Sequence, residues 1–239
     1  MFMKFTSIKR AAVYCVILSL LIAILAVPGQ TAMAAPVDTS EYNATEVSKI
    51  LKDTDIFNLK SQSAILIDAA TGNILFEKNS RERRPIASIT KIMSMMLVME
   101  AIENGKLSLD DMVPVSEYAY GFGGSQVYLE PGEEFTVHEM LKAVAIHSAN
   151  DATVALAEKV AGTENAFVAM MNEKAQELGL TDTYFRDCSG LTTEGHYSTA
   201  YDVAVMSREI VNKYPKILEY TKIWHDTFRN GEFSLDNTN

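Results

Sequence analysis

The sequence predicts an α+β protein in which an antiparallel sheet is packed with a lobe of helices. Two observations carry this prediction. The β-rich runs 64–68 and 73–77 flank the turn residues Thr71-Gly72, and two alternating runs within 224–235 flank Asn230-Gly231, so each pair is typical of a β-hairpin. Between these hairpins lie segments with apolar residues at helical spacing, several of them closed by glycine.

Five helices are expected between the hairpins. Apolar residues recur at helical spacing from 87 to 105, and Gly105 ends that run. Thr136 and Glu139 form a capping box that opens a helix to about residue 146. The other three begin near residues 151, 164 and 199 and end at 161, at about 178 and before Pro215. A shorter helix is expected near 44–51, and segment 106–132 is expected to hold short strands and a loop.

The N-terminus has the pattern of a secretory signal peptide. Three basic residues precede the apolar run 11–27, and the small-x-small sequence Ala32-Met33-Ala34 follows it. We therefore expect 1–34 to be a signal peptide, 35–60 a lead-in segment and 61–239 the main domain, exported to the cell-wall side of the membrane. An uncleaved anchor is the alternative, but about 17 apolar residues are at the low edge for a membrane span. No membrane anchor is expected in the mature chain.

Charge and cysteine content exclude several partner classes. The chain carries 21 basic and 31 acidic residues, and because residues 1–34 hold three basic and no acidic ones, the remainder has a net charge of −13. Such a chain repels nucleic acid. The remainder keeps one cysteine, Cys188, which excludes an internal disulfide and is interpreted as a buried small residue. The methionine run 93–99 is likewise interpreted as core.

A lysine at the start of the first long helix is the strongest functional signal. Ser88 and Lys91 are three residues apart, so their side chains share one helix face within reach of a hydrogen bond. Apolar surroundings and the positive end of the helix both disfavour the ammonium form, which makes Lys91 a candidate base for the Ser88 nucleophile. The Ser88 N–H is a candidate oxyanion donor. Alone, the pattern is more typical of a capping serine beside a solvent-exposed lysine, because it occurs by chance in many chains.

A second polar pair lies between two of the expected helices. Ser148 and Asn150 sit in a short loop that can direct both side chains into a cleft, where a hydroxyl can relay a proton and an amide can bind both a lysine and a carbonyl. Alone, Asn150 is more typical of the N-cap of the following helix.

Taken together, these motifs resemble the penicillin-recognising serine peptidases and β-lactamases. The local sequence motifs are most similar to those of a low-molecular-weight serine-type D-alanyl-D-alanine carboxypeptidase (penicillin-binding protein), and within that family to those of the sporulation-associated branch of Gram-positive spore formers. The resemblance runs from about residue 61 to the last residue and is carried by Pro85–Lys91, Gly123–Gln126, Leu129–Glu133, Ser148–Ala152 and Gly195–Asp202.

The resemblance implies a β-lactamase/transpeptidase-like fold and an acyl-enzyme mechanism without a cofactor. Ser88 would attack the carbonyl between the last two D-alanines of a peptidoglycan stem peptide, with Lys91 as general base. Ser148 would pass a proton to the departing D-alanine, and Asn150 would position the acyl group. β-Lactams would acylate Ser88 in the same way and act as inhibitors.

One family motif is absent from the sequence. Relatives carry a Lys-Thr-Gly strand that binds the substrate carboxylate and supplies an oxyanion donor, whereas this chain ends at Leu235-Asp-Asn-Thr-Asn239 without it. The resemblance therefore leads us to expect a C-terminally truncated domain that lacks the closing strands. Since loss of one oxyanion donor costs about 10²–10³ in rate, little or no carboxypeptidase activity is expected from this polypeptide alone.

Two alternatives stay open from the residues. A secreted, non-catalytic wall-binding fragment would keep the cleft but not the turnover. A β-lactamase would need a carboxylate that activates water, for which Glu194 is the nearest candidate in the sequence. A metal site is poorly indicated, because Lys142 stands where a zinc-protease helix beginning at His138-Glu139 would need its second histidine.

Overall fold

The computed structural model describes residues 58–237 other than 193. The expected signal peptide at 1–34 and the short helix near 44–51 lie outside the described residues. The described part is a mixture of helices and short antiparallel strand pairs, α+β in type as the sequence predicts. No helix within it is long and apolar enough to cross a membrane. The helices and strands, with two 3₁₀ turns named η, are β1 (Ala64–Ile67), β2 (Ile74–Lys78), η1 (Ala87–Thr90), α3 (Lys91–Glu103), β3 (Met112–Pro114), α4 (Glu117–Tyr120), β4 (Glu134–Thr136), α5 (Val137–His147), α6 (Asn150–Ala161), α7 (Glu164–Glu177), α8 (Ala200–Lys213), α9 (Ile217–Thr221), β5 (His225–Phe228), η2 (Arg229–Gly231) and β6 (Phe233–Asp236).

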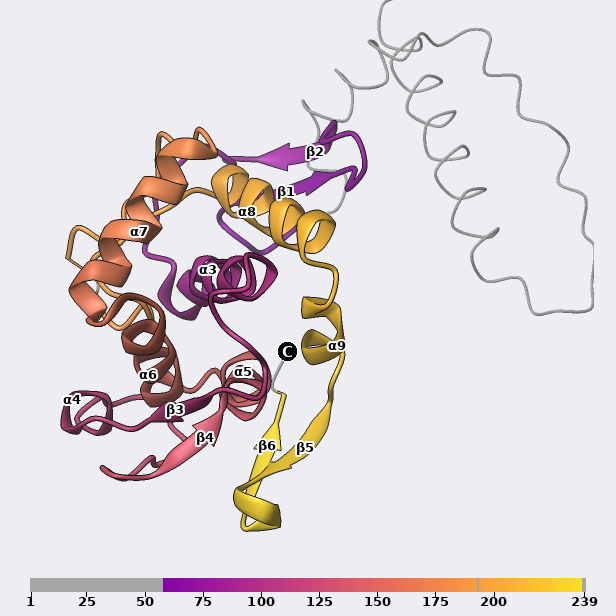
Figure 1. Cartoon of the computed structure of the whole chain (residues 1–239). Helices are drawn as coiled ribbons and strands as arrows, with labels where there is room; N and C mark the ends of the chain where they lie inside the picture. Colours follow the sequence, from indigo (N-terminus) through magenta and orange to yellow (C-terminus); the bar gives the residue numbers. More distant parts are fainter. Residues whose placement is uncertain (1–57, 193, 238–239) are drawn as a thin grey trace, which may run out of the picture. The chain divides into compact units, whose positions relative to one another are not determined.

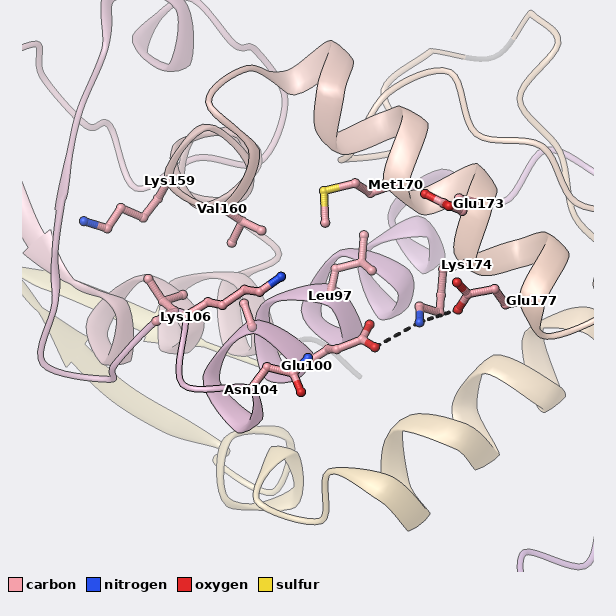
Figure 2. Close-up of a pocket in the computed structure, with 12 residues that line it drawn as sticks. Leu97, Glu100, Asn104, Lys106, Lys159, Val160, Met170, Glu173, Lys174 and Glu177 are labelled. Atoms are coloured by element: carbon pink, nitrogen blue, oxygen red, sulfur yellow. Dashed lines mark hydrogen bonds and ion pairs between the residues drawn. The ribbon is translucent and has the colours of Figure 1, made fainter.

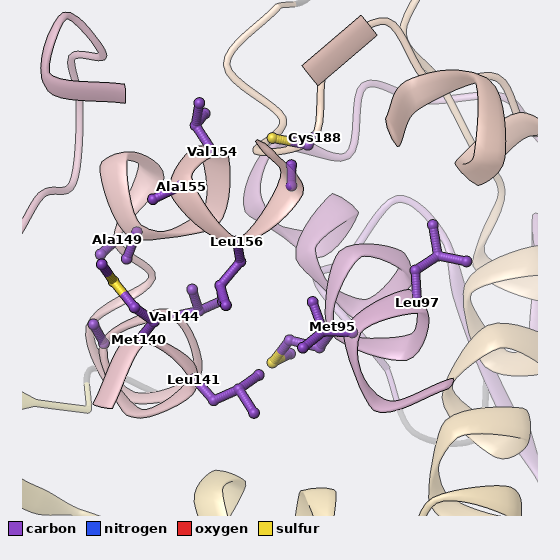
Figure 3. Close-up of a cluster of buried hydrophobic side chains, with 14 of the residues drawn as sticks. Met95, Leu97, Met140, Leu141, Val144, Ala149, Val154, Ala155, Leu156 and Cys188 are labelled. Atoms are coloured by element: carbon purple, nitrogen blue, oxygen red, sulfur yellow. The ribbon is translucent and has the colours of Figure 1, made fainter. Parts of the chain in front are cut away.

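Helix α3 is the centre of the helical lobe. It contacts α6, α7 and α8, and Figure 1 shows it between these helices and α5. Its apolar residues face all sides, which is the pattern of a helix buried on every face. Met93, Met95, Met96 and Met99 are all buried, so the interpretation of the methionine run as core is confirmed. Figure 3 shows Met95 and Leu97 of α3 in the same cluster as Leu141, Val144 and Leu156 of the neighbouring helices.

The strands pair locally. β1 pairs with β2, β3 with β4 and β5 with β6, each antiparallel, so the described residues contain three two-stranded sheets rather than the one sheet expected. The two hairpins predicted from turn residues are both confirmed. Each of the two hairpins closes through its own turn and packs on a helix, β1 on α8 and β6 on α5, whereas β3 and β4 are joined by the longer segment 115–133.

Helix boundaries follow their local signals. Thr136 and Glu139 form the capping box in full, with the Thr136 side chain and the Glu139 carboxylate each bonding the other's backbone N–H. Thr163 and Thr199 cap α7 and α8 through their hydroxyls. Three details differ from expectation, one of which is the short helix α9, a helix that the sequence analysis did not predict. The first helix opens with the 3₁₀ turn η1, and the expected strand-and-loop segment also holds the four-residue α4, capped by Ser116.

Candidate active site

The amine of Lys91 is held by three oxygen atoms from distant parts of the chain. Its Nζ lies 3.0 Å from Ser88 Oγ, 2.7 Å from Asn150 Oδ1 and 2.8 Å from the Ser189 backbone oxygen. The structure thus brings together three of the four candidate residues, Ser88, Lys91 and Asn150. Because three acceptors surround one nitrogen, the amine has a single orientation, directed at the serine hydroxyl.

Lys91 is almost completely buried, at 3% exposure. Burial lowers its pKa to about 8, while Cys188 and Asp187, which can carry negative charge, act in the opposite direction. Desolvation penalises the ammonium form, as the sequence analysis expected from the apolar surroundings. A solvent-exposed lysine beside a capping serine is therefore the wrong interpretation of this motif. The N-cap of α3 is Thr90, and no side chain caps it.

Ser88 lies in η1 and is exposed, so its hydroxyl faces solvent on one side and Lys91 on the other. The residue before it, Ala87, has a positive φ of 43°, which is uncommon for a residue with a side chain. Backbone from another loop packs tightly here. A Cβ at Gly190 would lie 1.8 Å from the Ala87 carbonyl oxygen, so only glycine fits that position.

Asn150 is the first residue of α6, and its side chain joins two segments. Oδ1 accepts from Lys91, and Nδ2 donates to the Gly123 carbonyl at 2.7 Å. Its backbone N–H bonds the Ser125 carbonyl at 2.7 Å. The N-cap of α6 is Ala149, so the interpretation of Asn150 as a helix cap is wrong. Both ends of the amide are occupied within the protein.

Ser148 lies two residues before Asn150 in a left-handed conformation, with φ 58°. It is half-buried, and its backbone N–H closes the last turn of α5 on Val144. Within the described residues, the hydrogen bonds of Lys91 go to Ser88, Asn150 and Ser189, not to Ser148. Ser148 is therefore close to Asn150 in the sequence, but it does not take part in the hydrogen bonds that hold the Lys91 amine.

The loop 187–192 supplies the contact that sequence analysis missed. The Asp187 carboxylate accepts the backbone N–H groups of four residues in its own loop: Ser189 at 2.8 Å, Gly190 at 2.5 Å, Leu191 at 3.3 Å and Thr192 at 2.6 Å. This wrapping turns the Ser189 carbonyl toward Lys91. The sequence motif Asp187-x-x-Gly190 indicates a tight turn. No local signal indicates its contact with a lysine 98 residues away.

A buried pair ties the Gly195-His-Tyr stretch to the Ser-Ile-Thr-Lys motif. His196 and Thr90 are 2% and 0% exposed, and His196 Nε2 lies 2.7 Å from Thr90 Oγ1. His196 Nδ1 accepts the Arg186 backbone N–H at 3.2 Å, so Nε2 carries the hydrogen and donates it to Thr90. Burial lowers the pKa of His196, which keeps this neutral tautomer.

The residues of the alternative sites lie elsewhere. Glu194 is exposed in a turn. His138 bonds the Tyr220 hydroxyl at 2.8 Å, and no group of three metal-ligating side chains occurs within the described residues. Cys188 is fully buried, as the sequence indicates, and burial raises its pKa well above the usual value, so its thiol is not ionised near neutrality.

A surface hollow of about 280 Å³ opens at the other end of α3 (Figure 2). Lys174 lies on its wall and pairs with Glu100 at 3.0 Å and Glu177 at 2.5 Å. None of Ser88, Lys91, Ser148 and Asn150 lines it. The candidate catalytic residues are therefore not associated with this hollow.

Solved structures of penicillin-binding proteins share this fold. Penicillin-binding protein 3 of Streptococcus pneumoniae, described as a peptidoglycan synthesis regulatory factor, is 37% identical, with a TM-score of 0.72 over 77% of this chain and 55% of that one. Ampicillin-bound penicillin-binding protein D2 of Listeria monocytogenes is 30% identical, with a TM-score of 0.67 over 76% and 73%. The fold expected from the resemblance is thereby confirmed.

The chain belongs to the D-alanyl-D-alanine carboxypeptidase family, peptidase S11, whose family model matches residues 47–239. D-alanyl-D-alanine carboxypeptidase DacF of Bacillus subtilis is 52% identical over 183 residues, which cover 75% of this chain and 47% of that protein. A D-alanyl-D-alanine endopeptidase of Pseudomonas aeruginosa is 34% identical over 76% and 58%. The family predicted from the motifs is confirmed. This chain spans about half the length of the curated relatives it matches.

Proposed function

We propose that this chain carries the catalytic centre of a penicillin-sensitive serine D-Ala-D-Ala carboxypeptidase that acts on peptidoglycan stem peptides through an acyl-enzyme on Ser88. The observation that carries the proposal is the pair of Ser88 and Lys91. An exposed hydroxyl lies 3.0 Å from a buried amine, and burial lowers the pKa of that amine to about 8. A serine needs such a base before it can act as a nucleophile.

Acylation begins with the neutral Lys91 amine. It takes the proton of the Ser88 hydroxyl as Oγ bonds to the carbonyl carbon of the penultimate D-alanine. The carbonyl electron pair moves to the oxygen, and the Ser88 backbone N–H stabilises the oxyanion. When the intermediate collapses, the C–N bond breaks and the leaving amine takes a proton, which we assign to transfer from Lys91 through the Ser148 hydroxyl. D-alanine departs and the ester on Ser88 remains.

Asn150 positions the groups of this reaction. Its Oδ1 accepts from Lys91 at 2.7 Å and thereby holds the amine against the serine. Its Nδ2 now bonds Gly123, so an approaching acyl group would share or replace that bond. A lysine that is already oriented loses less entropy in the transition state than one exposed to solvent.

Hydrolysis of the ester returns the enzyme to its starting state. Water attacks the ester carbonyl while Lys91 takes one of its protons, and the bond from carbon to Ser88 Oγ breaks with return of that proton to the serine. The products are a shortened peptide carboxylate and the free hydroxyl. A β-lactam acylates Ser88 by the same first step, and its opened ring stays attached.

The substrate and location follow from the family and the N-terminus. Relatives are named for D-alanyl-D-alanine cleavage, and one solved relative is a penicillin-binding protein with ampicillin bound. Peptidoglycan lies outside the cytoplasmic membrane, so the enzyme must be exported. We assign that role to residues 1–34, whose basic and apolar segments match a cleavable signal.

Labelling of the purified chain with a fluorescent penicillin tests this proposal. We expect covalent labelling that Ser88→Ala abolishes and Ser207→Ala leaves unchanged. Ser207 is the matched control because it lies on α8 and, within the described part of the chain, its hydroxyl donates to the Val203 carbonyl of the same helix at 2.8 Å. Absence of labelling would instead favour the non-catalytic wall-binding fragment. Release of D-alanine from a D-Ala-D-Ala peptide measures turnover separately, and many turnovers of a chromogenic β-lactam would indicate a β-lactamase.

A further inference from the structure

One buried carboxylate contacts two segments near the Lys91 amine: 118–124, which binds Asn150, and 187–192, which contains Ser189. Glu164 is the first residue of α7 and is 6% exposed. Its Oε2 accepts from the Tyr118 hydroxyl at 2.5 Å, and its Oε1 accepts from the Cys188 backbone N–H at 3.1 Å. Tyr118 and Cys188 are 70 residues apart in the sequence. The two oxygens of this side chain therefore join two segments that lie far apart in the sequence.

The first segment leads to Asn150. Tyr118 lies in α4, and its ring packs edge-to-face on Phe122 at 5.1 Å between centroids. The next residue, Gly123, accepts from Asn150 Nδ2 at 2.7 Å. Gly124 is also close, because a Cβ there would lie 2.7 Å from the same nitrogen. The position of this loop thus sets the orientation of the Asn150 amide, whose other end accepts from Lys91.

The second segment leads to Ser189. The Cys188 N–H donates to Glu164, and the Cys188 carbonyl accepts from Ser94 Oγ of α3 at 2.6 Å. Both backbone groups of this residue are therefore fixed. The next carbonyl, that of Ser189, accepts from Lys91 at 2.8 Å. A shift of the Cys188 peptide would move the Ser189 carbonyl with it, because the two are adjacent along a stiff backbone.

We propose that Glu164 is a positioning residue for catalysis, which holds the Asn150 and Ser189 acceptors of Lys91 in place by bridging the segments 118–124 and 187–192. The inference rests on the proposed function for its consequence in catalysis, but the bridge itself is a separate, measurable property. Two features are needed: a side chain long enough to reach both loops, and two polar atoms at its end.

If Glu164 acts as this bridge, the length of the side chain at position 164 matters more for its function than its negative charge. Glutamine keeps the length: its oxygen accepts the Cys188 N–H, and its NH₂ donates to the Tyr118 oxygen. Aspartate keeps the charge but is one methylene shorter, so it cannot reach both partners. A purely electrostatic role for Glu164 would predict the opposite order, with aspartate active and glutamine inactive.

The experiment compares Glu164→Ala, Glu164→Gln and Glu164→Asp with the unsubstituted chain, and Glu173→Ala serves as the control. Glu173 is an exposed glutamate on the same helix. Hydrogen–deuterium exchange is followed in the peptides that cover 118–124 and 187–192. We expect faster exchange in both segments for Ala and Asp, and exchange like that of the unsubstituted chain for Gln and the Glu173 control.

The rate of Ser88 labelling by a fluorescent penicillin is measured on the same samples. We expect a loss of at least about 10-fold for Ala and Asp and less than about 3-fold for Gln, since small misplacements of catalytic groups are costly. The pH of half-maximal labelling should also rise in Ala and Asp, because Lys91 gains access to water. A variant that only unfolds more easily would show less labelling, but the molecules that remain folded would keep the same pH of half-maximal labelling.

Tyr118→Phe keeps the inference testable if the Glu164 variants do not fold. Tyr118 is 52% exposed, so loss of its hydroxyl leaves the core intact. We expect faster exchange in 118–124 alone, whereas the neighbouring control Tyr120→Phe changes neither segment. Unaltered exchange in both segments for Glu164→Ala, or in 118–124 for Tyr118→Phe, would overturn the bridge. If no variant can be labelled, including the unsubstituted chain, the proposed function fails while the exchange data still decide the bridge.

Discussion

Lys91 and Asn150 are joined by a hydrogen bond of 2.7 Å from Nζ to Oδ1, although 59 residues separate them in the chain. The contact is buried on both sides, with exposures of 3% and 5%. It fixes the lysine amine beside Ser88 and away from water. The pKa of this amine, its orientation and the close packing of the backbone beside Ser88 each lead to a measurable consequence.

The rate of Ser88 acylation should depend on pH through Lys91. Burial lowers the pKa of this lysine to about 8 from an ordinary value of 10.5, so about one amine in ten is neutral at pH 7 instead of roughly one in 3,000. Only the neutral form can accept the serine proton. The labelling rate should therefore rise with pH, with a midpoint near pH 8, and level off above about pH 9. A midpoint near 10 would show that Lys91 is not the base.

The same shift predicts a pH-dependent stability difference between the unsubstituted chain and Lys91→Met. The folded pKa is lowered to about 8 from 10.5, so between these values the unfolded state binds the extra proton and stability rises with pH. A shift of about 2.5 units corresponds to about 3 kcal/mol. The unsubstituted chain should gain up to this amount relative to Lys91→Met between pH 8 and 10.5. Denaturant unfolding at both pH values measures it, and a constant difference would contradict the burial argument.

Gly190→Ala should destabilise the protein more than its backbone conformation alone explains. Its Cβ would lie 1.8 Å from the Ala87 carbonyl oxygen and 2.8 Å from Thr90 Oγ1, in a residue with φ +83°. Overpacking and the left-handed conformation together should cost more than about 3 kcal/mol. Gly231→Ala is the matched control, since it has φ +97° with nothing within 4 Å. It should cost only about 1–2 kcal/mol. Equal losses in denaturant unfolding would refute the close packing.

Ser148→Ala should slow acylation without moving its pH midpoint. The relay proposed for Ser148 is a general acid step, whose loss typically costs about 10²-fold or more. The lowered pKa of Lys91 comes mainly from burial, which this substitution leaves in place. Ser125→Ala is the control, because Ser125 Oγ bonds the carbonyl of His147, the residue before Ser148, at 2.7 Å. A similar loss of labelling rate in both variants would mean that the loop position matters and the Ser148 hydroxyl does not.

The features predicted correctly from the sequence depend on neighbours within a few residues. Ser88 and Lys91 face each other because residues three apart share one side of a helical turn. Thr136 and Glu139 form a capping box for the same reason. The short helix α4 was missed, since four residues are too few to show a helical period. Asn150 was singled out as an amide able to bind a lysine, but no local signal indicates its contact with Lys91, 59 residues away.

Local chemistry thus sufficed for the five long helices, the two hairpins and a lysine placed beside a serine. The tertiary structure decided whether that lysine is buried, which acceptors surround it and how far its pKa falls. Asn150, Ser189 and Glu164 reach the site from separate elements, and their hydrogen bonds exist only after the helices have packed around α3. Desolvation is a property of the packed interior, so its magnitude at Lys91 has no counterpart in any short stretch of sequence.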